Sequence, residues 1–456
     1  MNQQTLRHKP IVVVGLGRSG VAAARFLVNQ GARVTVTDRA TADTLADSLA
    51  ALAGLDVQLR LGGHALDDFT AAELVVLSPG VPHTLPLLDA VRARGIAVIG
   101  EMELAAGFIA EPILAITGTN GKTTTTEMVA AMLRSSGKRV FVGGNIGTPL
   151  VVHADVGAER VDVVVAEVSS FQLDTCVGFR PDIAVLLNIA DDHLDRYASF
   201  EAYAQSKWRI FTNQRSSDAA IVNIMDPAVA ALMDSHPLRA RRQCVADWAV
   251  RDGARIAGDR IVLVDHGRET AEVSLEKSAL LGPHNRENTA AACLAARQAG
   301  ATDAGIQQTI DDFTGLAHRL ETVAWVRGVR FVNDSKATNS DAVKRALECF
   351  DRPVSLIMGG RSKRGDFLSL RSHVRRHVKT LVAMGEAKPE IVAALVAAPQ
   401  HELVEADTLA DAVAKAFAAA APGETVLLSP ACASFDMFDS YADRGNQFRK
   451  IVEGLR

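Results

Sequence analysis

The segment Gly118-Thr-Asn-Gly-Lys-Thr-Thr124 contains the residues with the clearest chemical meaning in this chain. Its two glycines allow a tight turn in which successive backbone N–H groups point at phosphate oxygens. Lys122 supplies a positive charge for the β- and γ-phosphates, and the Thr123 hydroxyl can hold Mg²⁺. Ile116 replaces the first glycine of the usual phosphate-loop pattern, but an apolar run precedes the segment and a helical pattern follows it. The sequence therefore predicts a strand, a phosphate loop and a helix that bind ATP.

Acidic residues follow two further predicted strands. Glu167 ends the apolar run Val163–Ala166, where an unpartnered carboxylate is costly, so we predict that it is a Mg²⁺ ligand. The loop Asn188–Tyr197 follows the next predicted strand and contains Asp191, Asp192, His193 and Asp195. An imidazole among carboxylates suits a metal or phosphate site. The alternatives are a basic partner for Glu167 and a helix start for the aspartates.

Lys207 lies on a predicted helix, Phe200–Thr212, just after this acidic loop. The pattern alone predicts a solvated surface side chain and no chemical role.

The N-terminal segment contains Gly15-Leu-Gly-Arg-Ser-Gly20 between a predicted strand and a helix. Asp38 ends the next predicted strand, Arg33–Thr37, where its carboxylate can accept from a ribose or a base. The loop Ser78–Gly80 follows a third strand at the same predicted sheet edge. This pattern suits NAD and the diphosphate of a UDP-linked compound equally well.

The run Asn333–Asn339 follows a predicted strand near the start of the last third of the chain. Asp334 and Lys336 can contact a nucleotide ribose and phosphate there. The alternative is a capped helix that starts at Ser335 or Thr338.

Two more loops follow predicted strands in the last third. The glycine-rich, basic segment Gly359–Asp366 suits a substrate carboxylate, or else a surface turn. The segment Ser429–Phe438 combines small residues with aromatic ones and predicts a ligand-facing loop.

Alternating strand and helix patterns predict an α/β fold with parallel sheets. We expect three domains: a Rossmann-like N-terminal domain (1–100), a central P-loop ATPase-like domain with a parallel sheet (101–315), and a Rossmann-like α/β C-terminal domain (316–456). The short stretches Arg260–Val264 and Glu269–Val273 predict an antiparallel appendage to the central domain.

Composition narrows the class of protein. The net charge of -4 over 456 residues argues against nucleic-acid or membrane affinity. Five scattered cysteines, with no closely spaced pair, predict reduced thiols, mostly buried. The chain contains no uncharged apolar run of membrane-spanning length, and charged residues interrupt the first apolar stretch. We expect a cytoplasmic protein with no membrane span.

Taken in order, these motifs resemble the Mur ligase family, the ATP-dependent amide-forming enzymes of peptidoglycan precursor synthesis. The resemblance covers nearly the whole chain, and its most specific elements are Gly118–Thr124, Glu167–Gln172, Asp192–Tyr197, His284–Asn288, Ala317–Arg319, Asn333–Asn339 and Ser429–Ser434.

The resemblance implies roles for residues around ATP. The implied ATP-binding residues are Gly118, Thr119, Asn120, Gly121, Lys122, Thr123, Thr124, Asn288, Arg319 and Asp334. The implied ligands of two Mg²⁺ ions are Thr123, Glu167, His193 and Lys207, with Lys207 carbamylated so that its side chain becomes anionic. The implied catalytic residues are Lys122, His193, Lys207 and Lys336, with Lys336 near the reacting phosphate.

The resemblance also assigns the substrates and reinterprets the first domain as a UDP-binding rather than an NAD-binding domain. The implied contacts of UDP-N-acetylmuramoyl-L-alanine are Leu16, Arg18, Asp38, Arg39, Ser78, Gly80 and Asn145. The family branch that adds D-glutamate is the most similar one, and its implied amino-acid contacts are Thr338, Lys363, Ser434 and Tyr441. The family expectation for the oligomeric state is a monomer.

The implied reaction activates a carboxylate before an amine attacks it. The L-alanine carboxylate attacks the γ-phosphate of ATP, with Mg²⁺ offsetting the repulsion between the anions. The D-glutamate amine then attacks the acyl phosphate and gives an amide, ADP and phosphate. Activation is needed because a carboxylate is a poor electrophile.

Several alternatives stay open from sequence. An NAD-dependent oxidoreductase leaves the loop at Gly118–Thr124 unexplained, and a non-catalytic nucleotide-binding module has no use for so many polar strand ends. Within the family, the alternatives are a ligase for another amino acid and folylpolyglutamate synthase. The chain has no Asp-Asn-Pro-Arg motif of the kind associated with diaminopimelate addition, and its first domain suits UDP rather than folate.

Overall fold

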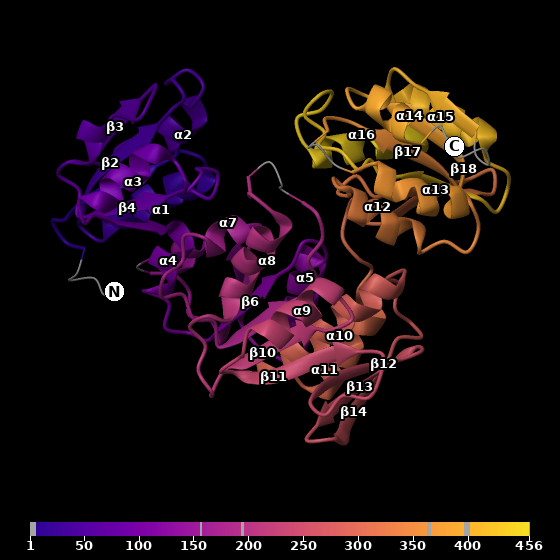
Figure 1. Ribbon diagram of the computed structural model, residues 1–456, viewed down its shortest axis with the longest axis horizontal. Helices are drawn as coiled ribbons and strands as arrows, with labels where there is room; N and C mark the ends of the chain where they lie inside the picture. The colour runs from indigo at the N-terminus through magenta and orange to yellow at the C-terminus, as the bar shows by residue number, and fades with distance from the viewer. Residues whose placement is uncertain (1–5, 156, 193–195, 363–365, 396–401, 456) are drawn as a thin grey trace. The chain divides into compact units, whose positions relative to one another are not determined.

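The computed structural model describes residues 6–155, 157–192, 196–362, 366–395 and 402–455. They form an α/β fold with three sheets (Figure 1), as the alternating pattern predicts. The chain divides into two compact units, which are described separately. The first unit comprises Met1–Asn188, Glu201–Glu276 and Thr289–Ile310, and the second comprises Ile189–Phe200, Lys277–Asn288 and Asp311–Arg456. The first unit contains two of the sheets.

The N-terminal sheet is parallel throughout, with strand order β3-β2-β1-β4-β5. Its strands are β1 (Pro10–Val14), β2 (Arg33–Asp38), β3 (Val57–Leu61), β4 (Leu74–Leu77) and β5 (Ala97–Gly100), and its helices are α1 (Arg18–Asn29), α2 (Ala46–Ala51) and α3 (Pro86–Ala93). This order confirms the Rossmann-like prediction, because β1 lies centrally and leads into the glycine loop. The edge strands β3 and β5 were not predicted. In β3 the three central residues are exposed, so no hydrophobic pattern marks it.

The central sheet has strand order β14-β13-β12-β11-β10-β9-β6-β8-β7. Its strands are β6 (Ile113–Thr117), β7 (Val140–Gly144), β8 (Val163–Glu167), β9 (Ile183–Leu186), β10 (Ala219–Asn223), β11 (Arg241–Ala246), β12 (Gly253–Ala257), β13 (Arg260–Asp265) and β14 (Arg268–Ser274). The helices of this part of the chain are α4 (Glu101–Ala106), α5 (Lys122–Ser135), α6 (Leu150–His153), α7 (Ser170–Leu173), α8 (Phe200–Trp208), α9 (Pro227–Ser235), α10 (Pro283–Gln298) and α11 (Asp303–Asp312). Strand β6 pairs with β8 and β9, so the carboxyl ends of these three strands meet at one edge.

The predicted antiparallel stretches are strands β13 and β14, which do pair antiparallel. The prediction of an appendage was wrong, because these strands continue the central sheet. Strand β11 pairs parallel with β10 and with β12, and β12 pairs antiparallel with β13, so the hydrogen-bonded ladder has no break.

The C-terminal sheet has strand order β15-β16-β20-β17-β18-β19 and is parallel except for the β15–β16 pair. Its strands are β15 (Glu321–Val326), β16 (Val329–Asn333), β17 (Val354–Gly359), β18 (Val378–Met384), β19 (Glu402–Glu405) and β20 (Thr425–Leu428). Its helices are α12 (Ser340–Leu347), α13 (Arg371–His377), α14 (Lys388–Leu395), α15 (Leu409–Ala419) and α16 (Tyr441–Glu453). The alternative helix starts at Ser335 and Thr338 were wrong, because Asn339 caps α12 by accepting from the Ala342 N–H at 2.8 Å.

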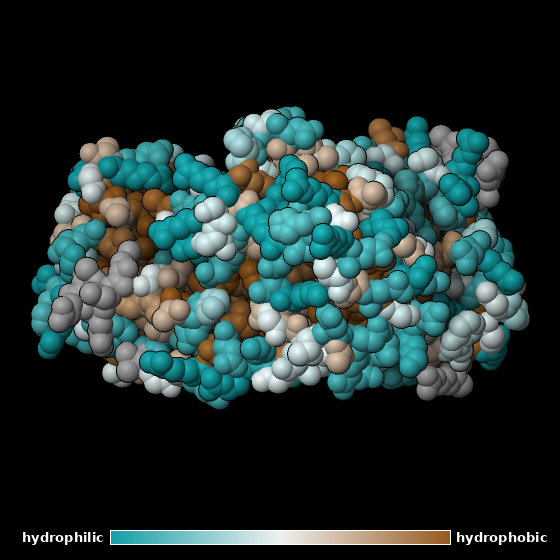
Figure 2. Space-filling view, turned by 90° about the horizontal axis from the view of Figure 1, so that it is seen from below, coloured by the Kyte–Doolittle hydropathy of each residue, from teal (hydrophilic) through white to brown (hydrophobic). Residues whose placement is uncertain are grey.

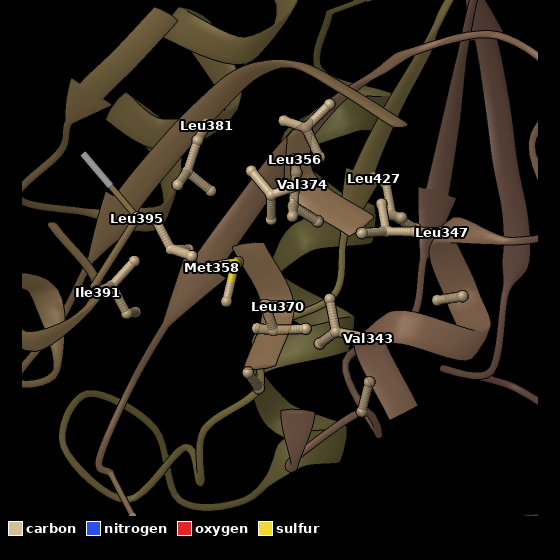
Figure 3. Close-up of a cluster of buried hydrophobic side chains, with 14 of the residues drawn as sticks. Val343, Leu347, Leu356, Met358, Leu370, Val374, Leu381, Ile391, Leu395 and Leu427 are labelled. Carbon is tan, nitrogen blue, oxygen red and sulfur yellow. The ribbon is translucent and has the colours of Figure 1, made fainter. Parts of the chain in front are cut away.

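Two hydrophobic clusters cover the two faces of the C-terminal sheet. Leu356 and Met358 of β17 pack into one cluster with helices α12, α13 and α14 (Figure 3), while Ile357 packs into the other, beneath α15 and α16. Every residue of β17 is buried. Strands covered on both faces are apolar along nearly their whole length, which is why such runs predicted parallel strands correctly.

Figure 2 shows a face on which hydrophobic residues are scattered among hydrophilic ones. Among the described residues, no helix combines the length and the apolar character needed to cross a membrane. All five cysteines are free thiols, and three of them are buried.

Candidate active site

The phosphate loop connects β6 to α5 in the first unit. Gly118 has φ 158°, and a Cβ added there would lie 3.0 Å from the Leu187 Cβ. Gly121 has φ 83° and precedes the first residue of α5. The Lys122 Nζ donates to the carbonyl oxygens of Gly118 and Thr119 at 2.8 and 2.9 Å. The lysine therefore curls back over its own loop, where a phosphate would offer it a charged acceptor.

Asn188, two residues after the end of β9, binds this loop through three hydrogen bonds. Its carbonyl oxygen accepts from the Thr119 N–H at 2.9 Å, and its side-chain oxygen accepts from the Asn120 N–H at 2.8 Å. Its side-chain nitrogen donates to the Asn120 carbonyl at 3.0 Å. Asn188 had no role of its own in the predictions from sequence, and its position after a strand was the only signal.

Glu167 ends β8, beside the strand that leads into the phosphate loop, with Ile116 as its neighbour across the ladder. Its side chain is 1% exposed. One carboxylate oxygen accepts from the Asn145 side chain at 2.6 Å, and the other is buried with no hydrogen-bond partner among the described residues. A buried carboxylate oxygen without a partner is costly, and a hard cation is the partner that such an oxygen prefers. This oxygen therefore fits the role of a Mg²⁺ ligand.

Lys207 is 2% exposed, so the prediction of a solvated side chain was wrong. Its Nζ donates to the Gly118 carbonyl at 2.8 Å and lies 4.7 Å from the centre of the Tyr203 ring. The Tyr203 hydroxyl is in turn 3.1 Å from the Thr119 hydroxyl. Helix α8 buries Lys207 together with apolar neighbours, and only its packing against the phosphate loop brings this amine to the site.

The acidic loop after β9 is only partly described. His193 and Asp195 lie outside the described residues. Asp191 is exposed, and the Asp192 carboxylate accepts from the Asn339 side chain at 3.1 Å within the second unit. Neither of these two aspartates begins a helix, because α8 starts at Phe200.

A cavity of about 650 Å³ lies in the first unit at the carboxyl ends of β1, β2 and β4. Six of the seven residues predicted to contact the UDP-linked substrate line it, namely Arg18, Asp38, Arg39, Ser78, Gly80 and Asn145. Leu16 is different because its side chain is fully buried. The cavity brings together the glycine loop of the N-terminal sheet and the loop after β7.

Asp38 and Ser78 shape this cavity by holding its backbone. The Asp38 carboxylate accepts from the N–H groups of Leu16 and Ala40 at 2.6 and 2.8 Å. The Ser78 hydroxyl donates to the Gly15 carbonyl at 2.8 Å. The turn of the glycine loop thus depends on side chains from two neighbouring strand ends, as well as on glycine.

In the second unit, Asp334 follows β16 and is buried. Its two carboxylate oxygens accept from the Leu320 N–H at 3.2 Å and from the Ser429 hydroxyl at 2.9 Å. Burial raises the pKa of Asp334 to about 7, and these hydrogen bonds and the charge of Arg319 oppose the rise. Arg319 lies between His318 and Leu320, which both have positive φ values, of 64° and 47°. The bent backbone there places Arg319 close enough to act on Asp334.

The predicted amino-acid contacts gather near the same strand ends. The Lys336 Nζ lies 3.8 Å from the centre of the Tyr441 ring, which is partly exposed at the start of α16. Ser434 is buried in the loop after β20, and its carbonyl accepts from the Phe438 N–H at 2.9 Å. Thr338 is half-buried in the loop before α12. The remaining predicted contact, Lys363, lies outside the described residues.

Arg444 joins three of these strand-end loops and was missed from sequence. Its guanidinium donates to the Ser335 hydroxyl and carbonyl, both at 2.9 Å, and to the carbonyls of Cys432 at 3.1 Å and Gly359 at 3.3 Å. The side chain is 1% exposed, and burial lowers its pKa to about 10. An arginine on an amphipathic helix gives no local signal for such a position.

Asn288 is buried in α10, and its side chain donates to the Asn285 side chain at 3.3 Å.

The predicted ATP and metal residues are divided between the two units. The first unit contains Lys122, Thr123, Glu167 and Lys207, and the second contains Asn288, Arg319, Asp334 and Lys336.

Three family models match the chain in succession. "Mur ligase MurD-like, N-terminal domain" matches residues 9–100, "Mur ligase middle domain" matches 116–296, and "Mur ligase, glutamate ligase domain" matches 318–432.

Similar proteins match over nearly the whole length. A UDP-N-acetylmuramoylalanine--D-glutamate ligase from Desulfosudis oleivorans is 48% identical, covering 98% of this chain and 97% of its own. One from Desulfatibacillum aliphaticivorans is 47% identical and covers 99% of both chains. The structure of the MurF ligase from Thermotoga maritima in complex with ADP shares the fold, with a TM-score of 0.62 at 17% identity over 100% of this chain and 97% of that one.

Proposed function

This chain belongs to the Mur ligase family, and from this premise we propose that it is the ATP-dependent ligase that joins D-glutamate to UDP-N-acetylmuramoyl-L-alanine, a step of peptidoglycan synthesis that yields ADP and phosphate. The observation that carries the proposal is the buried Glu167 oxygen without a partner beside a phosphate loop. Such a site suits a metal-assisted phosphoryl transfer. The alternative of an NAD-dependent oxidoreductase is not supported, because the first domain matches the MurD-like model.

The donor atoms suit magnesium, and we propose two Mg²⁺ ions held by Thr123, Glu167, His193 and carbamylated Lys207. When bound, Mg²⁺ lowers the repulsion between a triphosphate and an incoming carboxylate. The chain supplies the rest of the charge stabilisation. Lys122 binds the transferred phosphate at the loop, and Arg319 offsets charge on the phosphates. Asp334 accepts from a nucleotide hydroxyl, and Asn288 supports the same nucleotide.

Carbamylation of Lys207 is supported by the surroundings of its amine. In this reaction the neutral amine attacks CO₂, a C–N bond forms, one proton leaves, and the amine becomes an anionic carbamate. The Lys207 Nζ is buried and shares the Gly118 carbonyl with the Lys122 ammonium group. Two cations at one carbonyl repel each other, so converting one of them to an anion favours the site.

Lys207→Ala tests this part of the proposal. Turnover falls sharply in the variant, and a short carboxylic acid or bicarbonate restores part of it by supplying the missing carboxylate. A variant with full activity, or one that no small acid rescues, would remove Lys207 from the metal site.

The substrates occupy the remaining predicted residues. The cavity lined by Arg18, Asp38 and Asn145 is the proposed site of the UDP-linked substrate. We propose that Asn145 faces the muramyl-alanine end of that substrate. Lys336 lies near the reacting phosphate, and the D-glutamate contacts are Thr338, Lys363, Ser434 and Tyr441. We also propose that the chain acts as a monomer, as expected for the family, in the cytoplasm, where ATP is available.

The deciding experiment is an ADP-release assay with UDP-N-acetylmuramoyl-L-alanine and, in turn, D-glutamate, L-glutamate, L-alanine and diaminopimelate. We expect ADP release with D-glutamate alone. A response to another amino acid and none to D-glutamate would replace the substrate assignment. Release with no amino acid at all would contradict a ligase.

A further inference from the structure

Helix α4 follows directly after the last strand of the N-terminal sheet, and its two glutamates bind backbone elsewhere in the first unit. Glu101 is 1% exposed, and one of its carboxylate oxygens accepts from the Val151 N–H at 2.8 Å. The other oxygen is buried with no hydrogen-bond partner among the described residues. Burial raises the pKa of Glu101 to about 7, and the N–H groups of Leu150 and Val151 oppose that rise. Neither the family motifs nor the proposed chemistry uses this buried group.

The backbone that Glu101 holds leads straight into the substrate cavity. Val151 lies in α6, and α6 begins immediately after the loop Gly144–Pro149. Four residues of that loop line the cavity, namely Gly144, Asn145, Gly147 and Pro149.

The other end of the same loop is bound to Glu167, at the end of β8. The Asn145 N–H donates to the Glu167 carbonyl at 2.8 Å, and the Asn145 side chain donates to the Glu167 carboxylate at 2.6 Å. The loop is therefore held at one end by Glu167 and at the other by Glu101. Without the hydrogen bonds of Glu167 or of Glu101, this part of the cavity wall becomes more mobile, and a ligand must order it on binding.

We propose that Glu101 is a positioning residue that holds the loop Gly144–Pro149 in place and so sets the affinity for the UDP-linked substrate. The inference rests on the proposed function for the identity of that substrate. Glu101 touches no part of the cavity and acts only through the α6 backbone.

Glu103 provides a matched control on the same helix. Its carboxylate accepts from the N–H groups of Val177, Gly178 and Phe179, at 3.2, 2.7 and 2.8 Å. None of these residues lines the cavity. The two glutamates thus differ in which backbone they hold, and both hold it by the same kind of bond.

The experiment compares Glu101→Ala, Glu101→Gln and Glu103→Ala in the full-length enzyme. Glu101→Ala raises the KM for UDP-N-acetylmuramoyl-L-alanine about tenfold and leaves kcat and the KM values for ATP and D-glutamate within about threefold. Glu101→Gln keeps an acceptor oxygen for Val151 and stays within about threefold of wild type in every constant. Glu103→Ala leaves the KM for the UDP-linked substrate unchanged. If Glu101→Ala does not fold, Glu101→Asp takes its place, because the shorter side chain withdraws the carboxylate from Val151.

Hydrogen–deuterium exchange of the ligand-free proteins separates this inference from the proposed function. Glu101→Ala accelerates exchange in residues 144–153, and Glu103→Ala does so only near 177–179. If wild type shows no ligase activity, the proposed function fails while exchange still tests the hold on the loop. The inference is overturned if exchange in 144–153 is unchanged, if the KM for the UDP-linked substrate does not rise, or if Glu103→Ala raises it equally.

Discussion

The carboxyl ends of the central and C-terminal sheets both gather buried charged groups, but they satisfy them differently. Beside the phosphate loop, one carboxylate oxygen of Glu167 has no hydrogen-bond partner among the described residues. In the C-terminal sheet, both carboxylate oxygens of Asp334 accept hydrogen bonds, and the Arg444 guanidinium donates four. The Glu167 oxygen lacks a partner that a cation can supply, whereas the Arg444 guanidinium is already bonded within the protein and acts as a scaffold between loops. A buried carboxylate oxygen without a partner therefore points to a ligand where it lies beside a phosphate loop, as in Glu167, and buried charge alone does not.

The largest effect that we expect is a loss of activity on changing the phosphate loop. Lys122→Ala lowers the rate of ADP release about 10³-fold, since it removes the positive charge at the transferred phosphate. The ADP-release assay measures this rate, and Lys450→Ala, at an exposed position of α16, is the control. An unimpaired rate in a correctly folded variant would end the case for phosphoryl transfer at this loop.

The scaffold is tested by Arg444→Ala, which leaves buried acceptors of three loops without a donor. We expect the free energy of unfolding of the second unit to fall by about 3 kcal/mol. Urea denaturation measures it. Arg449→Ala on the same helix removes a more exposed ion pair with Glu321, and should cost less than about 1 kcal/mol. Equal losses in the two variants would refute the special role of Arg444.

Glu167→Gln should weaken the use of Mg²⁺ without lowering stability, whereas Arg444→Ala should lower stability. The Mg²⁺ concentration needed for half-maximal rate rises at least about tenfold, because a neutral amide is a poor Mg²⁺ ligand. The stability of the ligand-free protein does not fall, because an amide costs less to bury than an ionised carboxylate. Magnesium titration and thermal unfolding measure the two effects. A variant that unfolds more readily and keeps its magnesium requirement would make Glu167 part of a scaffold.

A separate effect is expected in the pH dependence of stability, through Asp334. Its pKa of about 7 in the folded protein exceeds the ordinary aspartate value of 3.8, so between these pH values the folded state binds the proton more tightly. The free energy of unfolding therefore falls as pH rises from about 4 to 7, by at most about 1.4 kcal/mol per pH unit from this one group. Asp334→Asn removes that part of the slope. Denaturation of both proteins across the range gives the difference, and parallel curves would show that Asp334 ionises normally.

Sequence by itself determined the parallel sheets and which polar residues stand at the ends of their strands. Apolar runs predicted the central strands. Because parallel strands share a direction, the ends of β6 and β8 lie at one edge of the central sheet, and the ends of β16 and β20 lie at one edge of the C-terminal sheet. The edge strands β3, β5, β15 and β19 escaped prediction, since half-exposed strands need neighbours to define them.

Only the tertiary structure decided which isolated charged side chains are buried at these edges. Lys207 contacts Gly118, and Arg444 contacts Ser335, from about a hundred residues away in each case. Glu101 reaches Val151 across fifty residues. Helix periodicity carries no information about such partners, because a helix specifies which of its residues share a face, and the rest of the fold specifies what that face meets.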